Sequence, residues 1–158
     1  MMFRMTRCCG FIAATLSAVV FSHVASVQAQ AVRPTPSAVM IGDNSGGRIG
    51  DFVALFHEYR SAGSQIHFSG YCDSACTLLL ALPRSQTCIS SGAVFRFHAP
   101  SAGSARVVNA ARKFILSRYP GWVRSWIANN SGLTTQLISM DYSYASKFMR
   151  TCNQVASR

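Results

Sequence analysis

The chain has 158 residues, with 15 Lys and Arg against five Asp and Glu, and 49% of its residues are hydrophobic. That length supports a single domain with one sizeable core. The basic side chains are scattered and no nucleic-acid-binding motif accompanies them, so the charge indicates a solvated cationic surface and no specific nucleic-acid partner.

The N-terminal stretch predicts a signal peptide over residues 1–29. Two arginines precede an apolar run from Gly10 to Phe21, which is shorter than the roughly 20 residues that span a bilayer. Val27-Gln28-Ala29 then offers small residues at the spacing that signal peptidase requires, and Ala29-Gln30-Ala31 is a second candidate cut. We expect cleavage rather than an uncleaved anchor, and therefore a periplasmic or secreted protein with no membrane attachment afterwards.

The mature chain begins with a flexible leader over residues 30–37, where two prolines lie among small polar residues. A single domain over residues 38–158 follows. Ala38–Ile41 is a short apolar run that predicts a buried parallel strand. The glycine-rich segment 42–47 predicts a loop with unusual backbone angles.

The middle of the chain alternates between helix and strand patterns. Apolar side chains one helical turn apart from Phe52 to Tyr59 predict a helix that ends near Gly63. Gln65–Ser69 predicts a strand, and the apolar run Ala75–Leu82 predicts a buried helix that ends before a proline. Two short strands follow, Gln86–Ile89 and Ala93–Phe97. This alternation indicates an α/β fold with a mainly parallel sheet.

The C-terminal third is predicted to be helical. Arg106–Tyr119 has the pattern of a cationic amphipathic helix, and Pro120 predicts a kink or split after it. Thr134 or Thr135 is expected to cap another short helix. Tyr144–Val155 predicts a C-terminal helix.

A serine at a strand-to-helix turn is the feature that points to chemistry. Ser74 lies at the start of the apolar helix, so its side chain is expected to stand above the sheet beside the free amides of that helix. A glycine pair upstream brings a second backbone N–H close, and His98 ends a strand that a parallel sheet places next to Ser74. We predict Ser74 as a nucleophile and His98 as its base. The alternative is that Ser74, or Asp73, only caps the helix.

These motifs occur in an order that resembles the proteolytic subunit of Clp protease, in the Clp/crotonase superfamily of stacked ββα folds. They are Gly46-Gly47, the turn from Gly70 to Ala75, and His98 followed by Ala99-Pro100, within residues 38–100. The chain looks most like small exported bacterial members. The resemblance implies repeated ββα or βαβ units and an oxyanion hole formed by the amides of Ala75 and of Gly47 or Gly46.

The third member of the triad is where the sequence departs from the family. The family aspartate precedes a pair that corresponds to Phe148-Met149, and the matching positions here hold Ala145 or Ser146. Asp141 lies one to two helical turns earlier, beside the site of a different, non-catalytic family aspartate, and is our candidate acid. The alternative is that a backbone carbonyl or a water orients His98.

Four cysteines remain after signal cleavage, and in an oxidising compartment an even number predicts one or two disulfides. They are Cys72, Cys76, Cys88 and Cys152. The sequence leaves all three complete pairings open. Cys72 and Cys76 lack a second close pair of Cys or His ligands for zinc, so we expect no metal, and the resemblance implies no cofactor.

The resulting hypothesis is an exported serine hydrolase, a peptidase that acts on peptide or unfolded polypeptide. Clp-type relatives form rings, so the resemblance also allows a homo-oligomer. One alternative is a non-catalytic binding or assembly module with the same fold. Another is a crotonase-like acyl-binding site, which export disfavours because coenzyme A thioesters belong to the cytoplasm.

Overall fold

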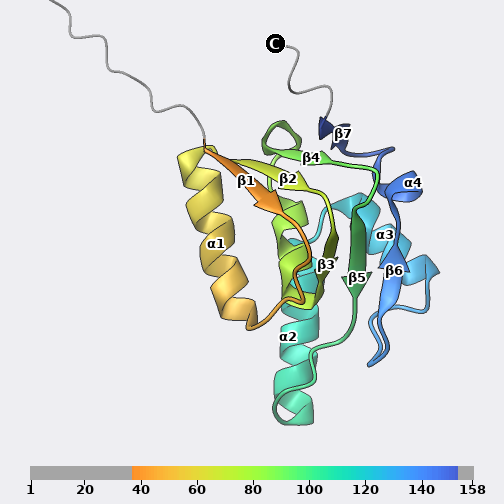
Figure 1. The fold of residues 1–158 in the computed structure, drawn as a ribbon. Helices are drawn as coiled ribbons and strands as arrows, with labels where there is room; N and C mark the ends of the chain where they lie inside the picture. Colours follow the sequence, from red (N-terminus) through yellow and green to blue (C-terminus); the bar gives the residue numbers. More distant parts are fainter. Residues whose placement is uncertain (1–36, 153–158) are drawn as a thin grey trace, which may run out of the picture. The chain divides into compact units, whose positions relative to one another are not determined.

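The computed structural model describes residues 37–152, so the predicted signal peptide and all but the last residue of the predicted leader lie outside the described residues. Strands and helices alternate along this part of the chain (Figure 1). In chain order the elements are β1 (Ala38–Ile41), α1 (Ile49–Ala62), β2 (Gln65–Phe68), β3 (Tyr71–Asp73), the 3₁₀ helix η1 (Ser74–Ala81), the 3₁₀ turn η2 (Arg84–Gln86), β4 (Thr87–Ile89), β5 (Val94–Phe97), α2 (Ala105–Arg118), α3 (Gly121–Asn129), β6 (Ile138–Met140), α4 (Tyr142–Ala145) and β7 (Arg150–Thr151).

The strands form two sheets. The first has the order β1-β2-β4-β7 and is parallel throughout, and the second has the order β3-β5-β6 with β6 antiparallel. Twice the chain places one strand in each sheet and then a helix: β2, β3 and η1, and later β4, β5 and α2. The predicted α/β fold with a mainly parallel sheet built from ββα units is therefore confirmed.

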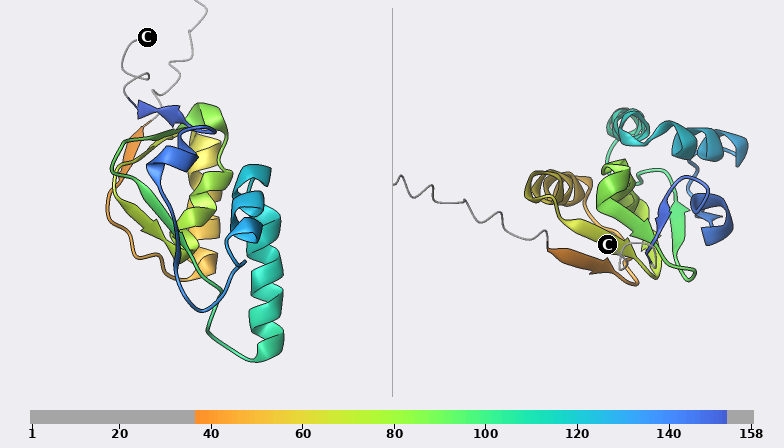
Figure 2. Two further views of the ribbon diagram at one scale, coloured as in Figure 1. Left: turned by 90° about the vertical axis from the view of Figure 1, so that its right-hand side faces the viewer. Right: turned by 90° about the horizontal axis from the view of Figure 1, so that it is seen from above.

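The helices α1, η1 and α2 lie on the same side of the sheets in both views of Figure 2. Among these helices η1 is almost entirely buried, with Cys76 and Leu79 fully inaccessible. Phe68 of the first sheet meets Phe95 of the second edge to face at 5.1 Å between ring centroids. The core therefore joins both sheets to η1, the helix that follows Ser74.

Parallel pairing of β3 with β5 decides where the candidate residues lie. Asp73 is opposite Arg96 in this register. Because both strands run in the same direction, the residues that follow them, Ser74 and His98, leave the sheet at the same end.

Two helix predictions for the C-terminal region are wrong. Thr134 caps no helix: its hydroxyl accepts a hydrogen bond from the Gln136 amide at 3.2 Å, and the chain then enters β6. Tyr144–Val155 is not one helix either, since α4 ends at Ala145 and β7 pairs with β4. The disulfide of Cys152 with Cys88 accompanies this pairing and holds the segment at the sheet.

The other departures are smaller. The apolar helix begins one residue earlier than predicted and is wound as a 3₁₀ helix, and β3 is a separate strand that the pattern did not indicate. The predicted split at Pro120 is confirmed, because α2 ends at Arg118 and α3 starts at Gly121. Within the part of the chain that the structure describes, no helix has both the length and the apolar character to cross a membrane.

Candidate active site

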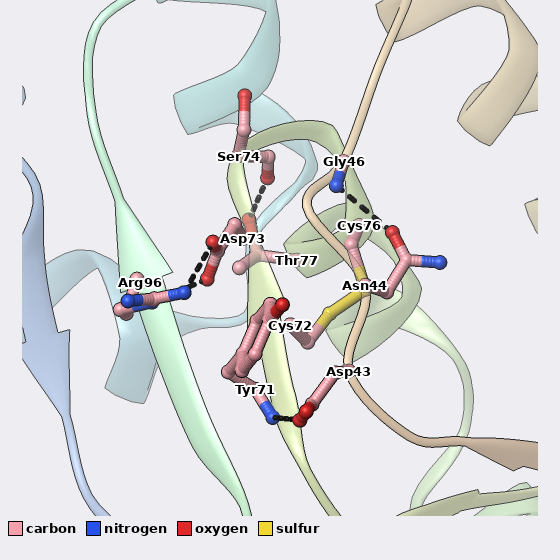
Figure 3. Close-up of polar contacts among 10 residues, drawn as sticks. All are labelled: Asp43, Asn44, Gly46, Tyr71, Cys72, Asp73, Ser74, Cys76, Thr77 and Arg96. Atoms are coloured by element: carbon pink, nitrogen blue, oxygen red, sulfur yellow. Dashed lines mark hydrogen bonds and ion pairs between the residues drawn. A yellow bond between two sulfur atoms is a disulfide. The ribbon is translucent and has the colours of Figure 1, made fainter.

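Ser74 has an unusual backbone conformation, with φ at 51°. Its carbonyl accepts a hydrogen bond from the Thr77 hydroxyl at 2.5 Å. Since the Thr77 hydroxyl has only one hydrogen to donate, the Tyr119 hydroxyl, 2.6 Å away, donates to Thr77 in turn. Figure 3 shows the Ser74 carbonyl directed toward Thr77 and its side chain directed away. The Ser74 hydroxyl has no hydrogen bond to another residue in 37–152.

The N-cap interpretation of the serine does not match this geometry. Asp73, not Ser74, occupies the N-cap position of η1, and no side-chain oxygen caps that helix. The Asp73 carboxylate instead receives two hydrogen bonds from Arg96, both at 2.6 Å. Arg96 also lies over the Tyr71 ring at 4.4 Å from its centroid. This pair links β3 to β5 directly before Ser74 and two residues before His98.

A disulfide encloses the serine turn. Cys72 is bonded to Cys76, so the two cysteines lie on either side of Ser74 in a loop with a sequence separation of four. Both are completely buried. The prediction of disulfides is confirmed, and the pairings that the sequence left open are Cys72–Cys76 and Cys88–Cys152.

The glycine pair lies directly against this turn. Gly46 has φ of 80°, and a Cβ atom built on it would lie 2.5 Å from the Asp73 carbonyl oxygen and 2.9 Å from Ser74 Cβ. Its N–H donates to Asn44 Oδ1 at 2.9 Å. The Gly47 amide donates to no acceptor within residues 37–152. Ala75 is the second residue of η1, and first-turn amides have no acceptor within their own helix.

His98 is half-buried at the end of β5, and a backbone carbonyl fixes its ring. Nδ1 lies 2.7 Å from the Ala99 carbonyl oxygen. A carbonyl only accepts, so Nδ1 carries the hydrogen, and Nε2 of the neutral ring is left as the acceptor. The Ala99 amide is itself bonded to the Thr134 carbonyl at 2.6 Å, which anchors this loop.

Ser74, Gly47 and His98 border one groove with a volume of about 480 Å³. The helix α2 contributes Val107, Ala111 and Ile115 to the lining, and Tyr119, which follows α2, also lines the groove. The groove therefore brings together the candidate nucleophile, the candidate base and the uncommitted glycine amide. Residues 37–152 contain no hydrogen bond between the Ser74 and His98 side chains.

Asp141 lies elsewhere and has other partners. It is the N-cap of α4, where its carboxylate accepts hydrogen bonds from the Ser143 hydroxyl at 2.7 Å and the Tyr144 amide at 3.1 Å. These bonds, the hydroxyl bond first, lower the pKa of Asp141 below its usual value. Among the described residues, no carboxylate lines the groove. Of the two sequence-based alternatives, a backbone carbonyl is the group that contacts the imidazole.

A separate group of possible metal donors lies in the first sheet. One ligand atom each from His67, Cys88 and Cys152 falls within 4.8 Å of the others. Both sulfurs are joined to each other, and His67 Nε2 lies 3.0 Å from the Ser90 hydroxyl. The oxidised pair leaves no thiolate to bind a metal ion, so the set does not fit one in this form.

No protein-family model matches the sequence, and no curated protein matches it. Among similar solved structures, a crystal structure described as that of an enzyme has a TM-score of 0.53 at 9% identity, covering 74% of this chain and 76% of that chain. A peptidase from Plasmodium falciparum has a TM-score of 0.48 at 11% identity, covering 73% of this chain and 75% of that chain. A mutant of ClpP1 from Listeria monocytogenes has a TM-score of 0.41 at 12% identity, covering 72% of this chain and 70% of that chain. At 9% identity the first similarity concerns the fold alone.

Sequence reasoning missed the residues that hold the turn in place. Thr77 is the one hydroxyl side chain in the otherwise apolar run after Ala75, and a buried polar residue there was a usable signal. Nothing in the sequence linked Thr77 to Tyr119, which is 42 residues away. Burial raises the pKa of Tyr119 above its usual value.

Proposed function

We propose that this protein is an exported serine hydrolase that acts as a peptidase, with Ser74 as nucleophile and His98 as general base. The observation that carries the proposal is the meeting of three groups in one groove. They are the Ser74 hydroxyl on a left-handed turn, an imidazole whose Nδ1 carries the hydrogen, and the Gly47 amide. Within residues 37–152 neither the hydroxyl nor the amide has a hydrogen-bond partner.

In the proposed reaction the Ser74 hydroxyl attacks a carbonyl carbon while His98 Nε2 removes its proton. The amides of Gly47 and Ala75 stabilise the negative charge that develops on the carbonyl oxygen. When the tetrahedral intermediate collapses, the imidazolium protonates the leaving amine. Water then hydrolyses the acyl-enzyme with the same base.

The Ala99 carbonyl takes the position at Nδ1 that an aspartate has in a triad. A neutral carbonyl orients the ring but stabilises the imidazolium less than a carboxylate does. Loss of the triad acid lowers turnover by about 10⁴-fold in the best-studied case. We therefore expect slow but real catalysis.

Peptide or unfolded polypeptide as substrate, and assembly into a homo-oligomer, follow from the Clp resemblance of the motifs around Ser74. Export follows from the N-terminal sequence. Both disulfides are compatible with an oxidising compartment.

A fluorophosphonate probe tests the proposal, because it reacts only with an activated serine. Wild type should label at Ser74, Ser74→Ala should not label, and His98→Ala should label at least 100-fold more slowly. Ser101→Ala is a matched control because Ser101 lines the same groove, and His57→Ala removes an exposed imidazole on α1. Both controls should label like wild type.

The role of Asp141 is tested with the same probe. Because the Asp141 carboxylate is occupied at the N-terminus of α4, Asp141→Asn should label at the wild-type rate. A steep drop in a folded Asp141→Asn protein would instead make Asp141 the third member of a triad.

The alternative function, a non-catalytic binding or assembly module, is favoured by one observation: no carboxylate contacts His98 among the described residues. A folded and oxidised wild type that never labels at Ser74 would refute the hydrolase and favour the non-catalytic module.

A further inference from the structure

The charged side chain that lines the candidate groove is positive. Of residues 37–152, Arg48 is the arginine or lysine that lines the groove, and no aspartate or glutamate of this range lines it. Arg48 directly follows Gly47, so its side chain starts one residue from the amide that is proposed to hold the scissile carbonyl oxygen. Its guanidinium makes no ion pair with any carboxylate in the part of the chain that is described.

The local fold does not explain an arginine at this position. Arg48 is the N-cap of α1, has extended backbone angles and makes no side-chain capping hydrogen bond. Ser, Thr, Asp and Asn are the side chains that stabilise this position. A cation at a helix N-terminus also opposes the helix dipole. Arg48 is thus exposed, unpaired and unfavourable for its helix, yet it borders the groove.

The part of the groove lining that α2 supplies has a different character from the part around Arg48. Val107, Ala111 and Ile115 of α2 present an apolar surface, and 54% of Val107 is exposed. A ligand that fits both sides carries an anionic group toward Arg48 and apolar surface toward α2. Because Arg48 adjoins Gly47, the anionic group belongs close to the carbonyl that is attacked.

Resting on the proposed function, we propose that Arg48 is a specificity residue that selects peptides with an acidic side chain on the residue that supplies the scissile carbonyl. The guanidinium binds this carboxylate as the acyl group enters the groove. An exposed ion pair of this kind is worth up to about a fivefold preference.

The test uses three thiobenzyl esters, acetyl-Ala-Ala-Xaa, in which Xaa is Glu, its neutral isostere Gln, or Lys. The kcat/KM for wild type, after subtraction of the Ser74→Ala rate, should be about two- to fivefold higher for Glu than for Gln, and lowest for Lys. Added salt at about 1 M should reduce the Glu preference toward unity by screening.

Variants then locate the preference. Arg48→Gln should bring the Glu-to-Gln ratio to about one, and Arg48→Lys should keep most of it. Arg60→Gln is the matched control, since it removes the same charge from the last turn of the same helix and Arg60 does not line the groove. Arg48→Ser should abolish the preference while raising Tm, because serine caps α1.

The two proposals fail in different ways. A wild type that does not label with fluorophosphonate refutes the hydrolase, and the specificity with it. A wild type that labels at Ser74 but cleaves the Glu and Gln esters equally refutes the role of Arg48 alone. An Arg48→Gln protein that keeps the wild-type ratio also refutes it.

Discussion

The conformation of Ser74 is held by its neighbours against its own preference. A non-glycine residue in a sparsely populated backbone region costs about 1–3 kcal/mol, and such residues persist only where the surroundings impose them. Here the Thr77 hydroxyl bonds the Ser74 carbonyl, and Tyr119 bonds Thr77. The strained turn directs the serine side chain out of the sheet, as a nucleophile requires.

Tyr119→Phe should weaken this support with almost no change of shape. Loss of the hydroxyl leaves Thr77 with one acceptor interaction fewer, which should cost about 1 kcal/mol of unfolding free energy and slow fluorophosphonate labelling several-fold. Chemical denaturation and labelling rates measure the two effects. Tyr59→Phe is the control, because the Tyr59 hydroxyl makes no hydrogen bond within residues 37–152.

The same variant should change the dependence of stability on pH. Burial raises the pKa of Tyr119 above its usual 10.0, so the folded protein keeps the phenolic proton where the unfolded chain loses it. The stabilisation is therefore complete below about pH 10 and declines as the pH rises further. Wild type should lose more stability than Tyr119→Phe between pH 9 and 11, and equal losses would show that this phenol does not contribute.

At the scale of elements, the loop before α1 and the turn before η1 fit together through a residue without a side chain. Asn44 pairs with Cys72 as an isolated parallel bridge beside β3. Gly46 then passes so close to Asp73 and Ser74 that a methyl group cannot be placed there without movement of the backbone. The glycine loop thus packs directly against the serine turn, and it is also the candidate source of an oxyanion-hole amide.

Gly46→Ala should damage both stability and labelling. The left-handed backbone costs about 1–2 kcal/mol for alanine, and the contact with the Asp73 carbonyl should displace Ser74. We expect at least about 2 kcal/mol of lost unfolding free energy and near-complete loss of labelling.

Gly50→Ala is the opposite control for this prediction. Nothing lies within 4 Å of a Cβ at Gly50, which is inside α1. Alanine in this first turn should stabilise the helix by at most about 0.5–1 kcal/mol. A Gly46→Ala protein as stable and reactive as wild type would refute the close packing of the two loops.

At the scale of the whole molecule, the Cys88–Cys152 disulfide has a different role from the disulfide around Ser74. Cys88–Cys152 spans 64 residues and joins β4 to the residue that follows β7. Cys72–Cys76 spans only four. In the chain-entropy description, the stabilisation of a cross-link grows with the length of the closed loop.

The two cysteine pairs should therefore respond differently to replacement by alanine. Replacing Cys88 and Cys152 together should cost about 4 kcal/mol of unfolding free energy and leave labelling intact below the new Tm. Replacing Cys72 and Cys76 together should cost about 2 kcal/mol of unfolding free energy. It should also slow labelling strongly, because the turn around Ser74 loses its cross-link. Denaturation curves with labelling rates at 15 °C separate the effects, and equal effects on labelling would contradict this division.

Local sequence determined the elements whose patterns are complete within a short segment. The stretch Phe52–Tyr59 lies within α1 because its apolar side chains recur one helical turn apart. Gly63 ends that helix with φ of 68°, and Pro120 divides α2 from α3, both for steric reasons that act locally. The order of glycine pair, serine turn and histidine indicated which residues would meet, because parallel strands bring their carboxyl ends together.

Tertiary structure alone decided the rest. The segment after Tyr144 forms a strand because β4 and Cys88 are there to receive it, and its own helical pattern does not outweigh a sheet edge and a covalent bond. The support of Ser74 by Tyr119 joins residues 45 positions apart through Thr77. A hydrogen bond of this kind has no local sequence pattern, since its two partners are independent until the packing of the chain brings them within 3 Å.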